Sequence, residues 1–423
     1  MKNIFSIVAL LTVLITKAQE TIYPALPQKE TIALTHATIH VGNGKVIENG
    51  IVIFSNGKIT EVGPYSSAIS NAKVIDCKGK QIYPGLISTV TNLGLYEIQA
   101  VRSTRDDNEL GDFNPNVRSV IAYNTDSKVI NTVRCNGILL ANIVPDGGII
   151  SGSSSVVQLD GWNWEDAAYK KDGGLIFRVP FMSRFSDKDT NPVKKAMDKI
   201  DEARAFFSQA KSYFYESKHE HTNLKFDAVK GLFDKTQTLY VYADLVKEMM
   251  AGAELAKEFG FRTIIVGGAD SWKITDYLKE NNLPVILERP LSLPLMQDDD
   301  VDMFAKIPFL LQQAGVTYAI SDADAMSRYR NLPFNAGVAA GCGLTKEQAL
   351  QAITLNAAKL LGIDDRTGSL EKGKDANIVV SDGDLLNIRT NNVSYAFIQG
   401  RQISLDNKQK QLYERYKYKY NLK

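Results

Sequence analysis

Histidine is the side chain best suited to metal binding and to acid–base chemistry at neutral pH, and this sequence contains only four. His219 and His221 have the H-x-H spacing that brings two imidazoles together, but they stand in the polar run 216–223. Such a run is typical of a solvated loop, and the alternative is a weak metal site on a loop lying over the active face. His36 and His40 fall on an expected strand near the N-terminus, where surface or packing roles are usual.

A charged segment, 95–112, follows the first apolar strand of the central region. Loops in this position build the ligand-binding face of a barrel, which makes Glu97 and Arg102 candidate substrate-binding residues. A solvated charge run is an equally good interpretation. The next loop, 146–155, is rich in glycine and serine, and its glycines would allow a ligand to approach the backbone closely.

These candidates require a scaffold, and the central region supplies a regular one. Apolar runs at 138–144, 239–243, 263–268, 284–287 and 316–322 alternate with amphipathic stretches. This alternation predicts a parallel α/β sheet with both faces covered by helices. Segment 162–235 interrupts the rhythm and is interpreted as an insertion, and Thr345 with Gln348 predicts the start of a helix over 346–361.

The two ends of the chain have a different pattern, with short β-branched runs and turns at 31–83 and again at 364–405. The Asn56-Gly57 pair between two such runs is a strong hairpin signal. Neither piece is large enough for a stable core of its own, so we expect the two to associate. The tail 406–423 is basic and rich in tyrosine, and a solvated helix is favoured over an RNA-binding arm.

Three segments together carry a family resemblance. Residues 84–94, the stretch 354–362 with sequence T-L-N-A-A-K-L-L-G, and the run 368–380 resemble the imidazolonepropionase-like branch of the amidohydrolase superfamily. The resemblance implies a (β/α)8 TIM-like barrel with a small composite β-sandwich formed by both chain ends. It implies metal-assisted hydrolysis of C–N bonds in amides, cyclic amides or dipeptides, with zinc as the expected divalent metal if the protein is active.

The family's metal ligands are mostly replaced in this chain. The two first-strand histidines fall on Val90 and Asn92, and the mid-barrel histidines fall on Tyr242 and Val266. The last-strand aspartate falls on Asp322, the only retained ligand position, which the resemblance makes the candidate catalytic residue. Asp322 could act as a general base, but without a metal it has no obvious electrophilic partner. Valine offers no lone pair, and an amide oxygen is a poor substitute for imidazole. We therefore expect no metal at the family position and no other cofactor. Asn92 and Tyr242 instead become candidate substrate-binding residues.

The N-terminus predicts export. Lys2, an apolar core over 4–15 and Ala18 before Gln19 form the pattern of a signal peptide, which implies a periplasmic or extracellular protein with no membrane span after cleavage. The formal net charge of +1 does not favour a nucleic-acid partner. The expected organisation is signal peptide 1–18, linker 19–30, β-sandwich 31–83 and 364–405, barrel 84–363 with the insertion 162–235, and tail 406–423.

Two functions follow from these residues. In the first, the chain is an exported amidohydrolase-superfamily protein with a degenerate metal site, which binds a small amide or peptide-like ligand without catalysis. In that role it would form a homo-oligomer or pair with an active amidohydrolase relative. The alternative is an active C–N hydrolase with a remodelled site that uses Asp322, because a shared fold does not decide the function.

Overall fold

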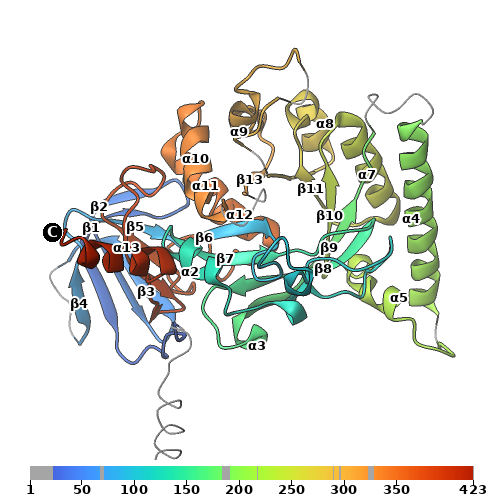
Figure 1. The fold of residues 1–423 in the computed structure, drawn as a ribbon. Helices are drawn as coiled ribbons and strands as arrows, with labels where there is room; N and C mark the ends of the chain where they lie inside the picture. Colours follow the sequence, from blue (N-terminus) through green and yellow to red (C-terminus); the bar gives the residue numbers. More distant parts are fainter. Residues whose placement is uncertain are drawn as a thin grey trace, which may run out of the picture.

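The computed structural model describes residues 22–66, 71–182, 191–216, 218–288, 290–294, 297–322 and 328–422. The predicted signal peptide, residues 1–18, lies outside the described residues. Two eight-stranded sheets organise the chain. Figure 1 shows the blue N-terminal strands and the red C-terminal helix on one side of the molecule, with the long helix α4 on the opposite side.

The first sheet combines strands from both ends of the chain, as the sequence predicts. Its strand order is β16-β15-β14-β5-β1-β2-β3, and β4 pairs with β1. The joining contact is the antiparallel pairing of β5 with β14, in which Ile82 faces Val380. The Asn56-Gly57 pair forms the predicted hairpin turn, with φ values of +50° and +78°. The strands are β1 (Ile32–His40), β2 (Val46–Ser55), β3 (Lys58–Pro64), β4 (Lys73–Asp76), β5 (Gln81–Pro84), β14 (Ile378–Ser381), β15 (Val393–Ile398) and β16 (Arg401–Gln402).

The second sheet is the barrel, and its strands follow one another in sequence order from β6 to β13. This order confirms the TIM-like barrel predicted for the central region. Most of these strands are buried along nearly their whole length, which accounts for the continuous apolar runs of β7 and of β10 to β13. They are β6 (Leu86–Thr91), β7 (Ile138–Ile143), β8 (Ile150–Gln158), β9 (Ala168–Arg178), β10 (Thr238–Ala243), β11 (Thr263–Gly267), β12 (Val285–Leu287) and β13 (Tyr318–Ile320).

One barrel strand runs against the others. β8 is antiparallel to both β7 and β9, so β7, β8 and β9 form a meander without intervening crossover helices. The segment 146–155, predicted as a loop, therefore contains most of a buried strand. Its glycines serve the tight return, since Gly147 and Gly148 have φ values of +83° and +63°. The predicted insertion 162–235 is also corrected, because β9 within it belongs to the barrel.

The barrel closes through a side chain. The Ser321 hydroxyl, after β13, donates to the Val90 carbonyl oxygen on β6 at 3.1 Å and accepts from the Val90 N–H at 3.3 Å. These two hydrogen bonds connect the residue that follows the last strand, β13, to the backbone of the first strand, β6, and satisfy both backbone polar groups of Val90.

Helices follow most of the barrel strands, as the predicted alternation of apolar and amphipathic segments requires. Thr345 and Gln348 form the predicted capping box, but the helix expected over 346–361 is broken after Ala352. Among the described residues, no helix has both the length and the apolar character needed to cross a membrane. The helices are α2 (Lys128–Arg134), α3 (Trp164–Ala167), α4 (Pro192–Tyr215), α5 (Leu224–Ala228), α6 (Lys230–Phe233), α7 (Val246–Phe259), α8 (Thr275–Glu280), α9 (Met303–Ala314), α10 (Leu332–Gly341), α11 (Lys346–Ala352), α12 (Leu355–Leu361) and α13 (Lys408–Lys419), with 3-10 turns η1 (Arg102–Thr104), η2 (Ser119–Ala122), η3 (Ser271–Ile274) and η4 (Tyr329–Asn331).

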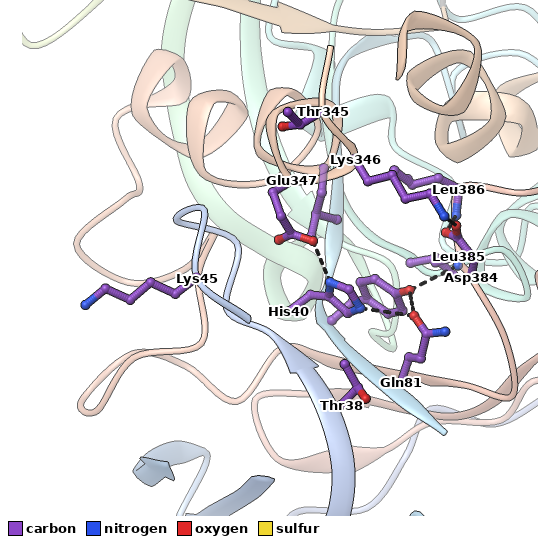
Figure 2. Close-up of polar contacts among 12 residues, drawn as sticks. Thr38, His40, Lys45, Gln81, Thr345, Lys346, Glu347, Asp384, Leu385 and Leu386 are labelled. Carbon is purple, nitrogen blue, oxygen red and sulfur yellow. Dashed lines mark hydrogen bonds and ion pairs between the residues drawn. The ribbon is translucent and has the colours of Figure 1, made fainter. Parts of the chain in front are cut away.

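His40 links the first sheet to helix α11. Its Nδ1 atom lies 2.6 Å from a carboxylate oxygen of Glu347 on α11, and its Nε2 atom lies 3.0 Å from the side-chain oxygen of Gln81 on β5, as Figure 2 shows. The imidazole also stacks on the Tyr83 ring at 4.5 Å between centroids. His40 is therefore a packed structural residue, in agreement with the interpretation made from the sequence.

Candidate functional site

The carboxyl ends of several barrel strands surround a small cavity of about 160 Å³. In barrels of this kind, ligand-binding residues gather at that end of the strands. The lining residues come from the ends of β6, β7, β9, β10 and β12, and they are Thr91, Asn92, Val144, Asp146, Arg178, Tyr242 and Glu288.

Arg178 brings a positive charge into this mouth. It is the last residue of β9 and pairs in register with Tyr242 on β10. The guanidinium carbon lies 4.0 Å from the centroid of the Tyr242 ring, within the range of a cation–π contact. One guanidinium nitrogen lies 3.1 Å from the Asp146 carboxylate, in the loop after β7.

Two polar groups of the lining residues are buried and have no partner among the described residues. They are the Tyr242 hydroxyl and the Nε atom of Arg178. Burial, reinforced by the nearby negative charge of Glu288, holds the pKa of Tyr242 far above its usual value. The phenol therefore stays protonated and remains able to donate a hydrogen bond. Other buried polar atoms among the described residues also have no partner, but these two belong to residues that line the cavity, where a ligand could satisfy them.

Asn92 and Asp322, two predicted site residues, already have protein partners. The Asn92 side-chain oxygen accepts a hydrogen bond from the Tyr329 hydroxyl. Burial raises the pKa of Tyr329 to about 12, so that this hydroxyl also stays a donor. One carboxylate oxygen of Asp322 accepts from the Asn335 amide at 3.0 Å, and Asp322 is buried but is not among the residues that line the cavity.

The positions that resemble metal ligands do not fit a zinc site. Val90 and Val266 are fully buried in the apolar core and offer no lone pair. Tyr242 presents a protonated phenol, and the Arg178 cation next to it would repel a metal ion. Among the described residues, no group of three or more His, Cys, Asp or Glu side chains is placed to hold an ion.

The other predicted site residues lie away from the cavity lining. The Glu97 carboxylate accepts from the Asn124 amide at 3.2 Å and from the Ser127 hydroxyl at 3.1 Å, which ties together the loop after β6. Arg102 is exposed at the start of η1.

The histidine pair after α4 is not assembled into a site. His219 stacks on Tyr213 with 3.8 Å between ring centroids and lies 3.1 Å from the Glu216 carboxylate. His221 is exposed. The placement of His219 indicates a packing role in the loop.

Sequence reasoning missed Arg178, Asp146 and Glu288. The sequence contains a pattern that could have predicted two of them. Arg178 directly follows the apolar run 175–177, and Glu288 directly follows the apolar run 285–287, so both are charged residues at the ends of apolar strands. Arg178 was hidden because its strand fell within the predicted insertion.

A larger hollow of about 880 Å³ lies at the opposite end of the barrel strands. It is lined by the starts of β11 and β12 and by the carboxyl ends of α7 and α8. Its basic residues, such as Lys257 and Lys279, stand near helix carboxyl termini, where positive charge is favourable for the helix itself. We therefore place the candidate site at the smaller cavity.

Comparison with known proteins supports the resemblance. The model of the amidohydrolase family matches residues 311–403. An imidazolonepropionase from Picrophilus torridus is 28% identical over 171 residues, which cover 39% of this chain and 42% of that protein. An N-acetylglucosamine-6-phosphate deacetylase from Danio rerio is 45% identical over 65 residues, 15% of this chain and 14% of that protein. The chain thus spans less than half the length of these relatives.

A solved structure matches much more of the fold. An amidohydrolase from Thermotoga maritima superimposes with a TM-score of 0.79 and 24% sequence identity, covering 88% of this chain and 99% of that one. At this identity the match concerns the fold, and it supports the barrel with its composite sheet.

Proposed function

Because the chain belongs to the amidohydrolase superfamily, in its imidazolonepropionase-like branch, we propose that it is an exported binding protein of that superfamily without catalytic activity. Its barrel mouth takes a small amide or peptide-like molecule in place of a hydrolysed substrate. The observation that carries this proposal is the Arg178 guanidinium, which stacks 4.0 Å from the ring at Tyr242, a position where the family resemblance places a metal ligand.

The chemistry of the mouth supports binding without hydrolysis. Hydrolysis of an amide needs an activated water and a group that stabilises the developing negative charge. Asp322 is the retained acid, but the Asn335 amide already uses one of its oxygens. Arg178 is held against Tyr242 and Asp146, so it is positioned to bind a ligand rather than to activate water.

We also propose that the protein is exported and that it associates with a second protein molecule. The signal-peptide pattern predicted over 1–18 supports a periplasmic or extracellular location. A protein that binds without catalysis acts through a second molecule, and we propose a second copy of this chain or an active amidohydrolase relative. Light scattering of the purified protein, alone and mixed with such a relative, measures both possibilities.

A hydrolysis screen tests the proposal against its alternative. The purified chain and the Asp322→Ala variant are incubated with N-acyl amino acids, cyclic amides and dipeptides, each with added zinc, manganese or cobalt. We expect both proteins to stay at the background rate. Turnover by the wild type that Asp322→Ala abolishes, with the variant still folded by circular dichroism, would establish the remodelled hydrolase instead.

A further inference from the structure

The two orphaned groups at the mouth share one chemical property. The Arg178 Nε–H can only donate a hydrogen bond, and the protonated Tyr242 hydroxyl has no acceptor among the described residues. They come from neighbouring strands and from residues paired in register. A ligand that completes this site must therefore bring acceptor oxygens, and the guanidinium charge favours an anionic acceptor over a neutral one.

The Asp146 carboxylate is an anionic acceptor that already contacts Arg178. It lies 3.1 Å from the Arg178 guanidinium, although 55% of the Asp146 side chain is exposed. The Asp146 N–H donates to the Asp107 carbonyl oxygen at 2.6 Å, and the carboxylate also accepts from the Gly147 N–H at 2.8 Å. The carboxylate can leave Arg178 by side-chain rotation, while the contact with Asp107 keeps the backbone of the loop in place.

We propose that the cavity selects a small molecule with a free carboxylate, which replaces Asp146 on Arg178 and accepts a hydrogen bond from Tyr242. This inference rests on the proposed binding function and narrows its ligand class. Arginine recognises carboxylates through two parallel N–H donors, which gives the contact directional specificity as well as charge attraction. In the absence of ligand, Asp146 neutralises Arg178 and acts as an internal competitor.

A ligand amine is the main competing possibility, because Glu288 also lines the cavity. An ammonium group has no acceptor to offer to the Arg178 Nε–H, and it would be repelled by the guanidinium. The two unsatisfied donors therefore favour the carboxylate, and an amine probe belongs in the experiment.

Titration calorimetry with matched probes tests the ligand class. N-acetylglycine carries the carboxylate, N-acetylglycinamide is nearly the same shape without the charge, and ethylammonium carries the opposite charge. We expect the wild type to bind N-acetylglycine roughly tenfold or more tightly than the amide, the effect of one hydrogen bond to a charged group. Arg178→Gln should remove this difference, and Tyr242→Phe should weaken N-acetylglycine binding by roughly tenfold.

Asp146→Asn provides the most direct variant, because it removes the competing charge while its side-chain oxygen can still accept from the Gly147 N–H. We expect it to tighten N-acetylglycine binding by a larger factor than N-acetylglycinamide binding. The matched control is Arg204→Gln on α4, which removes another ion-paired arginine, bound to Glu258 at 2.8 Å, and should change neither affinity.

The outcomes separate this inference from the proposed function. Equal affinity for acid and amide, tighter binding of ethylammonium, no binding of any probe, or no response to Asp146→Asn would each overturn the carboxylate assignment. If the amide still binds, the binding function remains. Hydrolysis of either probe would overturn the proposed function, and the effect of Asp146→Asn would still decide the ligand class.

Discussion

At the residue scale, the hydroxyl groups of two barrel tyrosines differ in their surroundings. The Tyr242 hydroxyl is buried with no partner among the described residues, whereas the Tyr318 hydroxyl donates to the Gln312 side chain at 3.2 Å. An unpaired buried hydroxyl costs stability, and a paired one contributes to it. The two tyrosines therefore form a matched pair that distinguishes a ligand-binding group from a structural one.

We predict opposite effects of the same substitution at these two positions. Tyr242→Phe should leave the free energy of unfolding unchanged or raise it by about 1 kcal/mol, because the orphaned hydroxyl is removed. Tyr318→Phe should lower it by about 1 kcal/mol, because Gln312 loses its donor. Urea unfolding of the three proteins measures both values. A clear loss of stability in Tyr242→Phe would mean that the hydroxyl has a structural partner.

Sequence reasoning identified part of the site at this scale. Asn92 and Tyr242 were chosen as ligand candidates because the resemblance placed them at metal-ligand positions, and both line the cavity. Glu97 and Arg102 were chosen from a charge run alone, and neither lines the cavity. A run of charges does not specify where the loop folds, so the contacts of Glu97 with Asn124 and Ser127 could not be predicted.

At the element scale, the seam between β6 and β13 depends on one side chain. Ser321 bonds both the N–H and the carbonyl group of Val90, and both residues are fully buried. We predict that Ser321→Ala lowers the free energy of unfolding by about 2 kcal/mol, because two buried backbone groups lose their partner. Hydrogen exchange at the Val90 amide should accelerate correspondingly.

Ser212→Ala is the control for this prediction. The Ser212 hydroxyl is exposed on α4 and bonds the Ser208 carbonyl oxygen at 3.2 Å, so its loss should change stability little. Unchanged exchange at Val90 in Ser321→Ala would show that the seam is held by other contacts.

The hydrophobic pattern of the sequence predicted some barrel strands and not others. The strands β10 to β13 are short apolar runs between amphipathic helices, and the sequence located them well. β8 was missed because its sequence, I-S-G-S-S-S-V-V-Q, is half small polar residues, although every one of them is buried. The backbone N–H and C=O groups of β8 are hydrogen-bonded to β7 on one side and to β9 on the other. A hydrophobicity pattern contains no information about such backbone pairing.

At the scale of the whole molecule, Asp375 ties the barrel to the composite sheet. Its buried carboxylate lies 2.6 Å from Lys58 on β3 and 3.2 Å from Arg366, and it accepts from the Tyr169 hydroxyl on β9. Burial alone would raise the pKa of Asp375, but Lys58, Tyr169 and Arg366 outweigh it and lower the pKa. The charged form is therefore the one that stabilises the folded protein.

We predict a pH-dependent loss of stability in Asp375→Asn. A carboxyl group with a lowered pKa in the folded state contributes stability above its unfolded pKa of about 3.9, and this contribution is lost as the pH falls below it. Near neutral pH the variant should be less stable by about 2 kcal/mol, a moderate value because Lys58 and Arg366 reach solvent. Below about pH 4 the gap should shrink.

Asp198→Asn, an exposed position on α4, should show no comparable gap at either pH. Thermal unfolding of wild type and both variants between acidic and neutral pH measures the effect. A gap for Asp375→Asn that stays constant into the acidic range would contradict the account of this junction.

Metal content is the most direct test of the central claim, which is that the mouth binds a ligand through Arg178 and Tyr242 and holds no catalytic metal. Elemental mass spectrometry is applied to the protein and to Asp322→Ala, purified without chelators and without a histidine tag. The account predicts zinc, manganese and cobalt far below one atom per chain in both proteins. Near-stoichiometric metal in the wild type, lost in Asp322→Ala, would contradict it and indicate a rebuilt hydrolytic site.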